Sequence, residues 1–166
     1  MNAEQAKAVR DMMVTLIEGE AKATEKVFRA VTDNNYKPDG KSRSAWELST
    51  HMAMADIWFV HSIKNGAFAW TGEPAVPSEM KDGASVAEWH KKHLADGLSM
   101  LRAMSAEDLL RPVDFFGTSA PAVSWLGMMN NHSVHHRGQL ASYLRPMGSK
   151  VPAIYGMSAD EPMQMG

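Results

Sequence analysis

Histidines at helical spacing are the residues of this 166-residue chain best suited to chemistry. His132 and His136 are four residues apart, so on a helix they lie about 40° apart around the axis and one turn apart along it. Two imidazoles placed in this way can bind one metal ion at roughly 2.0–2.1 Å each. His135, three residues after His132, forms a competing pair. The apolar residues nearby favour the first pair, because they share a helix face with it and leave His135 at the edge: Trp125, Met129, Leu140 and Tyr143.

A third histidine, His51, shares the apolar face of an earlier expected helix. A single inward histidine is more often a hydrogen-bonded core residue than a metal ligand. Burying three imidazoles without partners, however, would cost roughly 1–3 kcal/mol for each, and a shared divalent ion removes that cost. We therefore predict a metal site formed by His51, His132 and His136. Three protein ligands leave a fourth position open, as in catalytic zinc sites. The apolar residues that share the face of His51 are Leu48, Met52, Ala55 and Phe59.

An open coordination position predicts two kinds of chemistry. Zinc can lower the pKa of a bound water to roughly 7, or it can bind and deprotonate an incoming thiol. The chain has no cysteine, so any such thiol would have to come from a cosubstrate. Glu47, four residues before His51, and Gln139, three after His136, are the candidate catalytic residues. Each has a simpler alternative: Glu47 can cap its helix together with Ser44, and Gln139 can be a polar surface residue.

Other polar residues have less specific interpretations. Arg137 can bind an anionic substrate, or it can interact favourably with the C-terminal end of its helix. His90 and His93 flank two lysines, which predicts a solvated helix face, and His61 is expected to be peripheral.

Composition excludes several classes of protein. Without cysteine, disulfides and thiolate metal sites are impossible. The formal charge of −2 shows no basic excess, which argues against a nucleic-acid partner. Residues 1–7 lack the pattern of a signal peptide, and no apolar run approaches the roughly 20 residues that a membrane span needs. We expect a cytoplasmic protein that does not engage a membrane.

The elements that must position these residues are expected to be helices. Apolar residues recur at helical spacing over residues 3–32, and further helices are predicted over 44–64, 85–104 and 121–145. Ser44–Glu47 and Ser85–Glu88 have capping-box spacing. Residues 65–83 are predicted to be mostly loop and 114–119 a connector. The expected fold class is all-α: a four-helix bundle over 1–150, with an irregular C-terminal tail over 151–166 packed on or near it.

Three segments resemble the DinB-like (damage-inducible) four-helix family: Trp46–His51, His132–Leu140 and Tyr143–Gly148. The resemblance covers almost the whole chain. It implies an up-down-down-up bundle with a divalent metal, usually taken to be zinc or nickel, on His51, His132 and His136. Relatives include transferases and isomerases that use low-molecular-weight thiols, and metal-dependent hydrolases; members are often dimers. Residues 151–156 also look like an ending found in part of the family.

Two hypotheses follow. The first is a metal-dependent enzyme, a homodimer, that acts on a small-molecule substrate by thiol transfer or hydrolysis, with a low-molecular-weight thiol as a possible cosubstrate. The alternative is a non-catalytic stress-response bundle with a structural metal or none, because the sequence contains no unambiguous acid–base pair.

Overall fold

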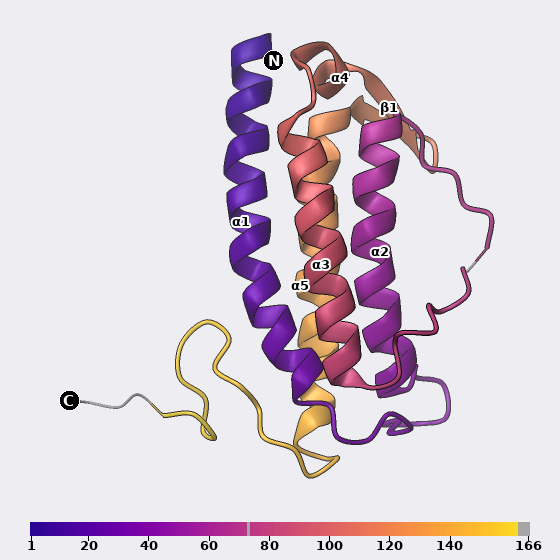
Figure 1. Ribbon diagram of the computed structural model, residues 1–166, viewed down its shortest axis with the longest axis vertical. Coiled ribbons are helices and arrows are strands. Elements are labelled where there is room, and N and C mark those ends of the chain that lie inside the picture. Colours follow the sequence, from indigo (N-terminus) through magenta and orange to yellow (C-terminus); the bar gives the residue numbers. More distant parts are fainter. Residues whose placement is uncertain (73, 163–166) are drawn as a thin grey trace.

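Four long helices lie side by side in the computed structural model, which describes residues 1–72 and 74–162 (Figure 1). They are α1 (Ala3–Arg29), α2 (Ala45–Asn65), α3 (Gly83–Arg102) and α5 (Trp125–Leu144). Both α1 and α2 pack against α3 and α5. The connection between α2 and α3 returns along the length of the helices, on the right of the view (Figure 1). Among the described residues, no helix is long and apolar enough to cross a membrane.

The segment between α3 and α5 contains short elements at one end of the helices. These are α4 (Ala106–Leu110), the strands β1 (Pro112–Phe115) and β2 (Thr118–Pro121), and the 3₁₀ turn η1 (Ala122–Ser124). The strands form an antiparallel hairpin in which Val113 pairs with Ala120. The hairpin corrects the expectation of an all-α chain, because the fold is mostly helical with one small sheet, and it shows that the connector expected over 114–119 contains strands. The last long helix was expected to begin near Pro121. It begins at Trp125, because Pro121 ends β2 and residues 122–124 form η1.

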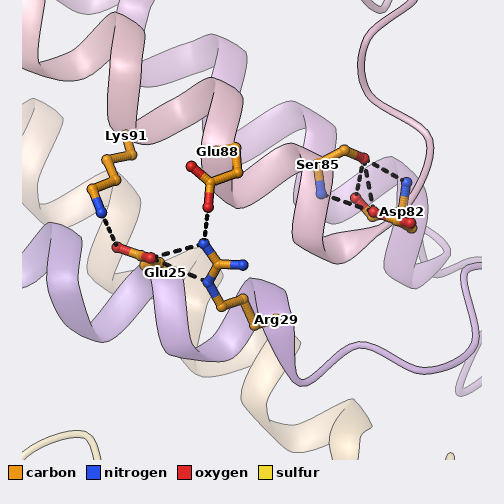
Figure 2. Close-up of polar contacts among 6 residues, drawn as sticks. All are labelled: Glu25, Arg29, Asp82, Ser85, Glu88 and Lys91. Carbon is orange, nitrogen blue, oxygen red and sulfur yellow. Dashed lines mark hydrogen bonds and ion pairs between the residues drawn. The ribbon is translucent and has the colours of Figure 1, made fainter.

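Capping residues determine where the helices begin. Ser44 and Glu47 form the expected capping box, in which the Glu47 N–H donates to Ser44 Oγ and the Ser44 N–H donates to Glu47 Oε2. The box expected at Ser85–Glu88 is wrong, because Asp82 is the N-cap of α3 and exchanges hydrogen bonds with Ser85 (Figure 2). Glu88 is left to pair with Arg29, which ties α3 to α1 (Figure 2).

The C-terminal tail lies against α1 and α5. Lys26 of α1 donates to the carbonyl of Ala153 at 3.3 Å, and the Tyr155 hydroxyl donates to Glu20 Oε2 at 2.6 Å. Arg137 of α5 is buried and donates both to the Glu20 carboxylate, at 2.5 Å, and to the Tyr155 oxygen. Arg137 therefore holds the tail and α1 against α5. This buried contact, rather than substrate binding or an interaction with the end of the helix, is what the structure shows for Arg137.

Candidate metal centre

The three predicted histidine ligands converge between α2 and α5. His51 on α2 faces His132 and His136, which follow each other by one turn on α5, and all three are half-buried. Their ring centroids are 4.5–5.1 Å apart. One ring nitrogen of each lies within 4.8 Å of the others, and no other group of three metal-binding side chains occurs among the described residues. His135 is exposed and outside the cluster.

Spacing and charge both fit a divalent ion. The Nε2 atoms of His51 and His132 are 3.2 Å apart. Nitrogen ligands at the usual zinc distance in a tetrahedron stand about 3.3 Å from each other. Burial lowers the pKa of His51 and of His132 to about 4, and neighbouring positive charges add to the effect. Both rings are therefore neutral at pH 7, which is the form that binds a metal.

Gln139 fixes the orientation of His136, the third candidate ligand. Its Oε1 atom lies 2.7 Å from Nδ1 of His136. An amide oxygen only accepts hydrogen bonds, so Nδ1 must donate and the lone pair lies on Nε2. A second hydrogen bond of this kind is how proteins set the tautomer and direction of a metal-binding imidazole.

Replacing Gln139 tests this orienting contact. Gln139→Ala should weaken zinc binding about 10–100-fold, the usual cost of losing a partner behind a histidine ligand. Gln139→Glu is the matched control, because a carboxylate still accepts from Nδ1 and should retain most of the affinity. Competition with a chromogenic chelator measures both. Equal affinity of Gln139→Ala and wild type would remove the assigned function.

Glu47 has the capping contacts that its position predicted. Its carboxylate accepts from the Ser44 backbone at 2.7 Å and lies 3.3 Å from Lys37 Nζ. The hydrogen bond from Ser44 is the main reason why the pKa of Glu47 is lowered, so the group is a carboxylate at neutral pH. It also lines the same pocket as His51. Its catalytic function stays a prediction.

An open pocket of about 660 Å³ lies next to the histidines. His51 and His132 form part of its wall. The remaining described lining is mostly apolar and comes mainly from α2, from the α2–α3 connection and from the β1–β2 hairpin, with Arg43 before α2 and Met128 on α5. Pockets of about 300–1,000 Å³ with apolar walls and a few polar groups are typical of small-molecule sites.

A buried polar cluster lies beside the histidines and was not expected. Asp56 of α2 accepts a hydrogen bond from His90 Nε2 of α3, at 2.8 Å, and another from the hydroxyl of Ser133 on α5. All three residues are buried, so the solvated face predicted for His90 is wrong. The two lysines that follow His90 suggested that face, but they are exposed while His90 points inward. Asp56 was the available signal, because it interrupts the apolar segment 52–60.

The lowered histidine pKa values predict loss of stability in acid for the metal-free protein. The unfolded chain, with histidine pKa values near 6.5, binds more protons than the folded chain below that pH. Unfolding free energy should therefore fall as the pH drops from about 6.5 towards 4. Urea unfolding at pH 7 and pH 5 measures the loss, which should be smaller in His51→Gln. An equal loss in both proteins would contradict this explanation.

Fold and site together define a mostly helical protein with a three-histidine cluster beside an open pocket. The DinB family model matches residues 2–165, and the chain belongs to the DinB family. In sequence it is 28% identical over 152 residues to the uncharacterized protein YrdA of Bacillus subtilis (strain 168), covering 90% of this chain and 89% of YrdA. It is 27% identical over 117 residues to the uncharacterized protein YjoA of the same strain, covering 69% and 73%.

Two crystal structures have the same fold. The DinB-like protein YjoA of Bacillus subtilis superposes with a TM-score of 0.68 and 24% identity, over 85% of this chain and 96% of YjoA. A DinB-like protein of Bacillus cereus ATCC 10987 superposes with a TM-score of 0.71 and 23% identity, over 86% and 95%. At these identities the likeness concerns the fold alone.

Proposed function

We propose that His51, His132 and His136 bind a divalent metal, zinc or nickel, and that the protein is a metal-dependent enzyme acting on a small molecule by thiol transfer or hydrolysis. The observation that carries the proposal is the 3.2 Å separation of two histidine nitrogens in the wall of a 660 Å³ pocket. A structural site would have its ligands closed off from such a pocket, whereas a catalytic site needs an accessible position.

The bound metal would supply Lewis acidity, which activates either water or a thiol. The chain's own residues contribute the rest. Three neutral imidazoles would leave the full positive charge of a bound ion on the site, and Gln139 holds His136 in the tautomer whose Nε2 lone pair is free to bind. Glu47 provides a negative charge near the substrate, while its contacts with Ser44 and Lys37 reduce its strength as a base. A low-molecular-weight thiol would be the cosubstrate in the transfer reaction, because the chain has no cysteine.

Metal analysis of protein purified without a histidine tag tests the first half of the proposal. One equivalent of zinc or nickel per chain is expected under metal-replete conditions, and its absence would refute the proposal. Activity is then assayed on a panel of electrophiles and esters, with and without bacterial low-molecular-weight thiols. Cobalt-substituted protein separates catalysis from a structural metal: added thiol or azide should change its visible spectrum, and an unchanged spectrum would favour the non-catalytic bundle.

The wider expectations belong to the same proposal. They are a cytoplasmic homodimer with a small-molecule substrate and no nucleic-acid partner, built on the up-down-down-up order of the long helices. The long return of the chain between α2 and α3 supports that order (Figure 1). Light scattering tests the dimer, and a salt-dependent DNA titration tests the absence of nucleic-acid binding.

A further inference from the structure

Exposed apolar side chains gather at the pocket beside the histidines. Within the described residues, four large ones from three parts of the chain belong to its lining: Trp70 and Val76 of the α2–α3 connection, Phe116 of the hairpin turn and Met128 of α5. Single exposed apolar side chains are ordinary, but several in one place mark a binding surface. The surface here is hollow, with a volume of about 660 Å³, which suits a small molecule.

Aromatic rings connect this lining to the histidine cluster. His132 packs against Phe59 with ring centroids 5.6 Å apart, and Phe59 lies 5.9 Å from Phe115. Phe115 in turn lies 4.9 Å from Phe116 at the hairpin turn. All four residues line the pocket. A molecule that lies against these rings therefore also lies beside the histidines.

Two tryptophans extend the aromatic surface. The Trp58 ring lies 5.8 Å from that of Trp70 and 6.3 Å from that of Phe115. Trp58 also donates to the carbonyl of Ala69 at 3.1 Å, which ties the α2–α3 connection to α2. The rings are held by these contacts before any ligand binds, so binding has little side-chain freedom left to remove.

Phe116 occupies a backbone position that disfavours it. It has a φ of 48°, and Gly117, the next residue in the hairpin turn, has a φ of 86°. Turns with two positive φ angles normally place Asn, Asp or Gly there, because a bulky side chain is strained in this region. Phe116 is also 74% exposed, so its ring gains little from burial. The needs of the fold therefore do not explain a phenylalanine here, whereas contact with a bound molecule does.

We propose that the pocket binds a substrate with a flat aromatic body, which lies against Trp58, Phe115 and Phe116 and brings the rest of the molecule to the histidines. This inference rests on the proposed function, because it names the substrate class of the same site. Aromatic pairs favour edge-to-face and offset contacts with centroids about 4.5–7 Å apart, which these rings already make with one another. The class is defined by the flat ring and not by charge.

Two matched probes test the proposal. 2-Naphthol and decahydro-2-naphthol have the same carbon skeleton and are both uncharged at pH 7, but only the first is flat and aromatic. Equilibrium dialysis against the full chain, with free ligand measured by chromatography, gives both affinities. 2-Naphthol should bind about fivefold more tightly, the factor that one aromatic pair adds beyond the area it buries. Because neither probe is charged, charged groups near the pocket contribute little to the comparison.

The dialysis is run on zinc-loaded protein and on protein from which metal has been removed by chelation. The preference for 2-naphthol should appear in both forms, because it depends on the rings and not on an ion. The two proposals can therefore fail separately. Zinc binding without 2-naphthol binding overturns the aromatic substrate alone, and 2-naphthol binding to a chain that holds no zinc overturns the metal site alone.

Phe116→Asn assigns the contact to a residue. It should weaken 2-naphthol binding about fivefold, as expected for the loss of one aromatic contact. Its melting temperature should be no lower than that of wild type, because asparagine tolerates a positive φ better than phenylalanine does. Met12→Asn is the control: it replaces another exposed apolar side chain, on α1, that does not line the pocket, and should leave the affinity within about twofold of wild type.

Several results would overturn the proposal. No binding of either probe excludes the apolar site, and equal affinity for the two probes excludes selection of a flat ring. Phe116→Asn with unchanged affinity, or with a lower melting temperature, shows that the ring serves the fold. Probe affinity that falls as protein concentration rises shows that a second copy of the chain covers the pocket.

Discussion

His132→Ala is expected to lower zinc affinity about a hundredfold or more. Zinc in peptide sites with four protein ligands is bound with roughly 10–16 kcal/mol, so each ligand contributes on the order of 3 kcal/mol. His132 contributes the nitrogen that lies 3.2 Å from Nε2 of His51, and its loss leaves two ligands on separate helices. Chelator competition at pH 7 gives the affinity, and elemental analysis after purification without a tag gives the stoichiometry.

The matched control is His135→Ala. His135 lies on the same helix, and its ring is 4.9 Å from that of His136, but it is exposed and does not belong to the cluster. Its replacement should leave zinc affinity within about twofold of wild type, because surface changes away from a site have small effects. If the two variants lost affinity equally, the competing pair of His132 and His135 would have to be reconsidered.

Asp56→Ala is expected to cost about 2–6 kcal/mol of unfolding free energy, because it leaves two buried groups without their hydrogen-bond partner, at about 1–3 kcal/mol each. Asp56 accepts from His90 of α3 and Ser133 of α5, so it joins three of the long helices. The carboxylate also fixes α5 against α2, the two helices that carry the histidine cluster. Urea unfolding of metal-free protein, monitored by circular dichroism, measures the change.

Two further variants define what Asp56 does. Asp96→Ala, an exposed position on α3, should change stability by less than about 0.5 kcal/mol. Ser133→Ala should cost about 1–3 kcal/mol, because it removes one of the two bonds to the carboxylate. A loss in Asp56→Ala no larger than in Asp96→Ala would mean that the cluster does not stabilise the fold.

The long helices could be predicted from sequence because each has a periodic apolar face, but their ends could not. Both Asp82 and Ser85 can cap α3. In the structure Asp82 is the N-cap, and Glu88, which a Ser85 cap would use, pairs with Arg29 instead. The hairpin could not be predicted because each strand is only four residues long: β1 alternates exposed and buried residues over too short a run to be distinctive, and β2 shows no alternation.

The candidate site was predictable to the extent that it lies on helices. The four-residue spacing of His132 and His136 and the apolar face of His51 determine which side chains meet in the structure. The pocket depends instead on how the α2–α3 connection and the hairpin fold back towards α2, and no periodic pattern describes such segments. No sequence pattern predicts that Phe116 lines the pocket, because the residue lies in the hairpin turn, where it and Gly117 have positive φ angles.

The three histidines and the aromatic side chains that line the pocket belong to different kinds of segment. His51, His132 and His136 lie on two helices that Asp56 holds together, whereas Trp70 and Phe116 lie on connections outside the helices. Connections tolerate insertion and substitution far better than packed helices do. Selection, or a mutant library confined to these two connections, can therefore change which molecules enter the pocket while the histidine cluster stays constant. One scaffold can diversify into many specificities in this way.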